Sequence, residues 1–126
     1  IRLARERAKT VKNLHFYVNN GRDLSLFPAD FFDFAYSLIV FQHIPDKEII
    51  ANYVAETQRV LKSKRVFKFQ VNGYVGSEYV SIPKDTWLGE SFSEDEIMQL
   101  CQRVGFKTIQ LTGAGTQYMW VTLLKN

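Results

Sequence analysis

The stretch FFDFAYSLIVFQHIP, residues Phe31–Pro45, decides the fold that we expect for this chain. Its segment Asp33–Val40 is almost wholly apolar, which is typical of a strand buried on both faces of a parallel sheet. His43 and Pro45 then interrupt the apolar run. The stretch therefore predicts an interior strand that is followed by a short loop and a helix.

The residues after this stretch predict an amphipathic helix and a second strand. Asp46–Leu61 places apolar side chains at helical spacing on one face and charged side chains on the other. Val66–Val71 has the apolar and branched composition of a strand. A strand, a helix and a strand in this order predict a layered α/β sheet.

The N-terminal part predicts a helix, a strand and a turn. Ile1–Thr10 is rich in helix-forming residues, whereas Leu14–Val18 alternates and is rich in aromatic and branched residues. Asn19, Asn20 and Gly21 follow, and these residue types tolerate tight turns. Because Ile1–Thr10 begins without a capping residue, we expect the chain to be a truncated piece of a longer one.

The C-terminal part predicts a helix and a closing hairpin. Ser93 and Glu96 have the spacing of a capping box, and Gly105 ends the apolar helical pattern that follows. Phe106–Leu111 and Gln117–Leu124 are predicted strands of a hairpin. The long connection before this helix, residues 72–90, is expected to be a lid, a binding loop or a disordered segment.

Composition favours one globular domain, residues 1–126, with a single core, because 46% of its residues are hydrophobic. There are 16 basic and 13 acidic residues, which are interspersed, so charge indicates neither a nucleic-acid nor a membrane partner. The single cysteine, Cys101, is expected to be a buried hydrophobe in a reducing compartment. This favours a cytoplasmic protein, and no apolar run of about 18 residues marks the chain for membrane insertion.

These elements and the helix exit Arg59–Lys62, RVLK, resemble the second half of class I S-adenosylmethionine-dependent methyltransferases. The resemblance implies an α/β, Rossmann-like sheet that is mostly parallel with an antiparallel last strand. It makes Leu14–Val18 the third strand and Asp33–Val40 the fourth, with the first and second strands missing. The glycine-rich loop and ribose-binding acid of the family would precede these residues. Ser63–Arg65 stands where the family usually has Pro-Gly-Gly.

The resemblance implies S-adenosylmethionine as the cofactor and, in the complete enzyme, an unidentified methyl acceptor that is a small molecule or another substrate. Residues at the adenine turn and after the fourth strand match the family's cofactor site: Asn20, Gly21, Ser37, Leu38, Phe41 and Gln42. The family usually has an aspartate where this chain has Asn20. Substrate-side candidates are His43, Tyr74 and Trp87. No catalytic residue is assigned, because methyl transfer depends mainly on positioning two reactants.

Several of these residues have a plain structural alternative. Phe41 and Tyr36 have the character of core aromatics. His43 precedes a helix, where it makes a structural hydrogen bond, contacts a ligand or acts as a general base. Trp87 either lines a lid or anchors a long loop. His15, His43 and Cys101 lack the spacing of metal ligands, so no metal site is predicted.

The missing strands have a structural consequence for Asp33–Val40, which would be left with an unpaired apolar edge. We expect either that Leu14–Val18 moves over to pair with it or that two copies join into a homodimer. An alternative function follows from the same gap. The chain would then be a non-catalytic interaction or regulatory module on a decayed methyltransferase fold, and the 126 residues alone would be inactive.

Overall fold

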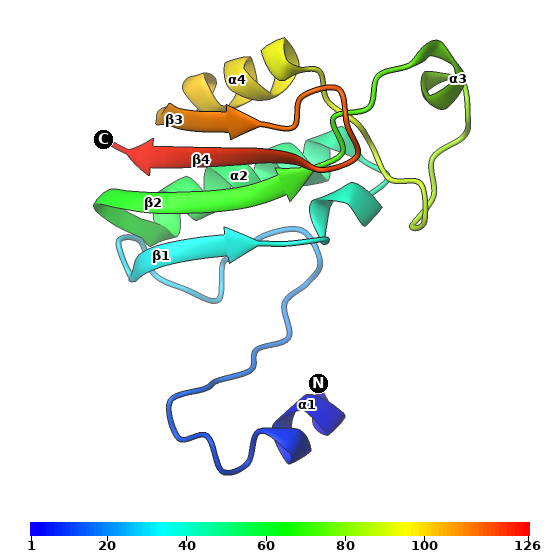
Figure 1. Ribbon diagram of the computed structural model, residues 1–126. Coiled ribbons are helices and arrows are strands. Elements are labelled where there is room, and N and C mark those ends of the chain that lie inside the picture. Colours follow the sequence, from blue (N-terminus) through cyan, green and yellow to red (C-terminus); the bar gives the residue numbers. More distant parts are fainter.

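The computed structural model describes the backbone of residues 1–126 and all side chains except those of Glu78 and Val80. Figure 1 shows one sheet with two long helices against it. Four strands lie in the order β1-β2-β4-β3: β1 Phe32–Ser37, β2 Leu61–Val71, β4 Met119–Lys125 and β3 Phe106–Thr112. β1 and β2 are parallel, and β4 is antiparallel to both β2 and β3. Three strands thus run one way and the last runs the other, as the sequence predicted.

Two capped helices cover one face of this sheet (Figure 1). α2, Lys47–Val60, begins where the Asp46 carboxylate accepts hydrogen bonds from two backbone N–H groups of its first turn. α4, Glu94–Arg103, begins with the predicted capping box between Ser93 and Glu96. Both predicted helices are therefore confirmed, because local capping and an apolar face indicate the same element.

The core lies between these helices and alternate residues of the central strands, where side chains point to the helical face. Cys101 in α4 is fully buried there, and burial raises the pKa of its thiol to about 12. The thiol is therefore protonated and behaves as a small hydrophobe. Other fully or nearly fully buried apolar residues of the strands and helices include Ile50, Val54, Val60, Leu61, Phe67, Phe69, Val71, Ile97, Met119, Val121 and Leu123.

The predicted strand Leu14–Val18 is wrong, because these residues are irregular and pair with no strand. Tyr17 and Val18 are largely exposed. Strand propensity stabilises a strand only where a partner and a packing surface are present. The expected rearrangement of this segment onto the edge of the sheet is wrong for the same reason. α1, Arg2–Arg7, buries no residue and lies apart from the sheet (Figure 1).

β1 is an edge strand, as expected for Asp33–Val40 when the first and second strands are missing, and the interior position that its apolar run alone indicated is wrong. It ends at Ser37, and the chain then bends into a 3₁₀ turn at Phe41–His43. Phe34 and Tyr36 are 55% and 53% exposed, so Tyr36 is not a core aromatic. Its ring stacks on Trp120 at 6.1 Å, on the face opposite the helices. Pairing of two copies along this open edge stays a prediction.

The irregular first part of β2 contains a strained residue that predicts a stabilising substitution. Lys64 has a φ of 60°, in the left-handed region where a side chain costs about 1 kcal/mol. Lys64→Gly is therefore expected to raise the free energy of unfolding by about 1 kcal/mol in urea titrations. Lys107→Gly, at an exposed site in β3, is the matched control and is expected to lower it. Equal destabilisation by both would contradict the strained conformation.

Candidate functional site

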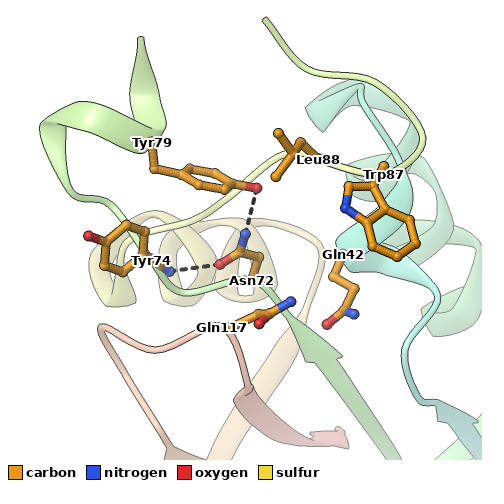
Figure 2. A pocket seen from close by; sticks show the side chains of 7 residues that line it. All are labelled: Gln42, Asn72, Tyr74, Tyr79, Trp87, Leu88 and Gln117. Carbon is orange, nitrogen blue, oxygen red and sulfur yellow. Dashed lines mark hydrogen bonds between the residues drawn. The ribbon is translucent and has the colours of Figure 1, made fainter. Parts of the chain in front are cut away.

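A pocket of about 310 Å³ opens just beyond the carboxyl end of β2. Asn72 directly follows this strand, and the remaining wall comes from the 3₁₀ turn, the connection after β2 and the hairpin before β4. Figure 2 shows the side chains around the open space. The lining residues are Gln42, Asn72, Tyr74, Tyr79, Trp87, Leu88 and Gln117.

Gln70, the penultimate residue of β2, ties the base of this pocket together. Its side chain is fully buried, and its Nε2 donates to Gln42 Oε1 at 2.6 Å and to the Gln117 carbonyl at 3.2 Å. Its Oε1 accepts from the N–H of Ile39 at 3.2 Å. One amide therefore joins the carboxyl ends of β1 and β2 to the hairpin, with each of its polar atoms satisfied.

Tyr79, in the short helix α3 (Ser77–Val80), forms one wall. Its hydroxyl donates to the Gly89 carbonyl at 2.7 Å and accepts from Asn72 Nδ2 at 2.6 Å, as Figure 2 shows for Asn72. Burial raises the pKa of Tyr79, with a smaller contribution from Glu90, and the Asn72 amide opposes the shift. The phenol is therefore a neutral bridge between the two sides of the connection.

Trp87 projects from a tight turn at the rim. Both the Trp87 and Leu88 N–H groups donate to Asp85 Oδ1 at 2.7 Å. These two bonds, that of Leu88 first, hold the pKa of Asp85 below its usual value. The Trp87 side chain is 80% exposed, and its ring lies 6.2 Å from that of His43. The turn thus fixes the backbone and leaves the indole open to solvent or ligand.

The segment from Leu88 to Phe92 passes very close to the 3₁₀ turn. A Cβ at Gly89 would lie 2.5 Å from the carbonyl oxygen of Gln42, a distance that no side chain tolerates. The next residue, Glu90, donates its N–H to the carbonyl of Ile44 at 2.9 Å. Only glycine allows this approach, which brings the segment after Leu88 directly against the 3₁₀ turn.

The carboxyl end of β1 carries two unusual features. Ser37 Oγ is buried and has no hydrogen-bond partner among the described residues. Ile39 has a φ of 53°, which is a rare and strained conformation for a β-branched residue. Strained backbone and unsatisfied polar groups gather at functional sites, so both features point to the end of this strand. Leu38, between them, is 43% exposed.

The turn around Asn20 and Gly21 is confirmed, but its polar groups bond to one another. Asn20 Oδ1 accepts from the N–H groups of Arg22 and Asp23 at 2.8 and 3.0 Å, and the Gly21 N–H donates to Asn19. Hydrogen bonds from Ser25 lower the pKa of Asp23 to about 2, with a further contribution from Asn20. The turn lies against α2 and contributes no residue to the pocket.

The structure brings together some of the residues predicted from sequence. Gln42, Tyr74 and Trp87 line the pocket, and His43 lies beside it with its Nε2 3.2 Å from Gln42 Nε2. His43 Nδ1 is buried without a partner among the described residues. Phe41 is different, because its side chain is 5% exposed and packs in the core.

Sequence reasoning missed Gln70, Tyr79 and Gly89. Gln70 carried a signal, since it is an uncharged polar residue between the apolar Phe69 and Val71 at the end of a strand. Tyr79 and Gly89 carried none, because their roles depend on long-range contacts.

Within the part of the chain that the structure describes, no helix is long and apolar enough to cross a membrane.

Comparison with known proteins identifies the family. A model of the methyltransferase domain matches residues 1–68, which is more than half of the chain. The chain belongs to this methyltransferase family. A search of curated protein sequences gave no significant match. The family match includes the end of β1 and the 3₁₀ turn but stops within β2.

Solved structures support the same fold. A methyltransferase from Methanosarcina mazei is similar with a TM-score of 0.75 and 18% identity over 99% of this chain and 76% of that one. One from Aquifex aeolicus gives 0.69 and 14%, covering 100% and 63%. Geranyl diphosphate methyltransferase in complex with SAM gives 0.79 and 11%, covering 99% and 64%. The chain therefore has a class I methyltransferase fold and spans about two thirds of these proteins.

Proposed function

We propose that this chain is part of an S-adenosylmethionine-dependent methyltransferase that acts on a small molecule. One observation carries the proposal. The unsatisfied Ser37 hydroxyl, the strained Ile39 and the pocket all lie at the carboxyl ends of two parallel strands, joined by Gln70. Open α/β sheets bind their ligands at this position.

The residues at the carboxyl end of β1 fit the methionine end of the cofactor. Ser37 Oγ lacks a partner and is suited to a hydrogen bond with the polar methionine end, while Leu38 offers exposed apolar surface beside it. At the adenine turn, the Asn20 oxygen is already occupied by two backbone donors. The proposed cofactor contacts of this chain are therefore strongest at Ser37 and Leu38, and weaker at Asn20 and Gly21.

The chain's own residues would position the two reactants and exclude water from them. S-adenosylmethionine, when bound, supplies an electrophilic methyl group. Gln42 lines the pocket from the 3₁₀ turn that follows β1, so a cofactor at the end of β1 and an acceptor in the pocket would meet beside its side chain. Tyr79 and Leu88 wall off the acceptor from solvent. Holding two reactants in line in this way accounts for methyl transfer without an acid or base in the pocket.

Binding of the cofactor to the 126-residue chain tests this proposal. We expect a dissociation constant on the order of 1 mM, which is about −4 kcal/mol, because one rim supplies few contacts. Ser37→Ala should weaken binding a further roughly fivefold by removing one hydrogen bond of about 1 kcal/mol. Titrations that follow the S-methyl resonance of the ligand by NMR measure both constants.

Ser63→Ala is the matched control, since Ser63 is exposed in β2 and remote from the end of β1. It should bind as the parent chain does. Equal loss in both serine variants would contradict the assignment of Ser37. Absence of binding in the parent chain would contradict the proposal and favour an interaction module on a methyltransferase fold.

A further inference from the structure

The pocket beside β2 carries no formal charge. Its lining consists of three amide side chains, three aromatic side chains and one leucine, and no acidic or basic residue is among them. A charged ligand that leaves water needs an opposite charge or several strong hydrogen bonds in the site. This lining offers no opposite charge. The pocket therefore disfavours both anions and cations.

The nearest charged side chains are already engaged elsewhere. Lys84 Nζ donates to the Tyr79 carbonyl and lies 3.7 Å from the centre of the Tyr79 ring. Lys84 lines a different cavity with Glu90 and Lys47 and is not among the lining residues of the pocket. It does occupy the Tyr79 ring that would otherwise attract a cation. Asp85 is saturated by the two N–H groups of its own turn.

The shape of the pocket suits a small planar ring. Tyr74 and Tyr79 meet edge to face at 5.7 Å, and Trp87 and Leu88 stand across the opening (Figure 2). A volume of about 310 Å³ is at the small end for ligand sites, which corresponds to one or two fused rings. Aromatic walls favour stacked or edge-to-face contacts with such rings.

One polar group on the wall is free to orient the ring. The Gln117 side chain lines the pocket and makes no hydrogen bond with any described residue. Its amide both donates and accepts, so it matches a ring N–H, a ring nitrogen or a hydroxyl. The Asn72 amide is in contrast held by Tyr79 and by the Tyr74 N–H.

We propose that the methyl acceptor is an uncharged molecule with a planar aromatic ring of one or two fused rings. This inference rests on the proposed function. A lone pair of the acceptor forms the bond to the methyl carbon, and the carbon–sulfur bond breaks with its electron pair remaining on sulfur. The product then loses its proton to water. A neutral acceptor keeps that lone pair available without prior deprotonation.

Three probes with one ring and different charges test the inference: 3-methylindole, indole-3-acetate and tryptamine. They are titrated into the ¹⁵N-labelled chain without cofactor, and the two tryptophan indole N–H signals are followed. We expect 3-methylindole to shift the Trp87 signal and to bind at least about tenfold more tightly than either charged probe. Trp120 is paired with Gln70 across β2 and β4 but does not line the pocket, so its indole signal should move less than that of Trp87. Trp87→Phe assigns the two signals.

A variant that places a negative charge in the pocket tests the same inference from the side of the protein. Gln117→Glu should strengthen tryptamine binding by about tenfold, because it supplies the missing opposite charge. Gln110→Glu makes the same change on exposed β3 and should alter nothing. Equal or tighter binding of a charged probe to the parent chain would overturn the inference, as would a shift confined to Trp120 or no shift at all. Cofactor titration is a separate experiment, so failure of the proposed function would be seen independently.

Discussion

Gln70→Leu is expected to lower the free energy of unfolding by about 3 to 5 kcal/mol. The change keeps the size of the side chain but removes both of its polar atoms. The Ile39 N–H, Gln42 Oε1 and the Gln117 carbonyl then lose a partner. The bond to Gln42 is buried and the other two are partly buried, and an unsatisfied buried group costs about 1 to 3 kcal/mol. Since small domains are typically stable by about 5 to 15 kcal/mol, the variant should still fold.

Urea denaturation monitored by tryptophan fluorescence measures this loss. Gln110→Leu is the matched control, since Gln110 is exposed on β3 and its replacement should change stability by less than about 0.5 kcal/mol. A loss below about 1 kcal/mol in Gln70→Leu would mean that the amide does not join the ends of β1 and β2.

Gly89→Ala is expected to detach the segment after Trp87 from the 3₁₀ turn. The new Cβ would meet the Gln42 carbonyl oxygen at 2.5 Å and the Ile44 nitrogen at 2.7 Å, and backbone atoms cannot rotate away. Overpacking of this kind costs about 1 to 3 kcal/mol. The Glu90 N–H loses its bond to Ile44, so its hydrogen exchange should accelerate by about tenfold or more.

Hydrogen exchange measured by NMR reads this effect at one amide. Gly115→Ala is the control, because nothing lies within 4 Å of its Cβ, although its φ of 73° costs about 1 kcal/mol. That variant should lose stability without a selective change at Glu90. Unchanged exchange of Glu90 in Gly89→Ala would show that the close approach is absent in solution.

The helices and the hairpin were predictable because their signals are local. Asp46, the Ser93–Glu96 capping box and Gly105 each specify an element boundary through neighbouring residues. The prediction of a strand at Leu14–Val18 is wrong for a different reason. Alternation of aromatic and branched residues indicates a strand only when a neighbouring strand pairs with it, and pairing is a long-range property.

The candidate site was predictable in its location but not in its construction. The resemblance led to Ser37 and Gln42, and composition led to the connection that holds Trp87. The network through Gln70 and the contact at Gly89 join residues that are about 30 to 50 positions apart, so no short pattern encodes them. Phe41 shows the converse, because its aromatic character fitted both the core and a ligand contact, and only packing placed it in the core.

The central claim is that S-adenosylmethionine binds at the carboxyl end of β1, beside a separate acceptor pocket. Protein-observed NMR tests it most directly, with cofactor added to the ¹⁵N-labelled chain that is already saturated with 3-methylindole. We predict that backbone amides move mainly from Ser37 to Gln42, while the Trp87 indole signal stays in its ring-bound position. Displacement of 3-methylindole by the cofactor, or amide shifts confined to the cavity between α4 and β3, would contradict the account.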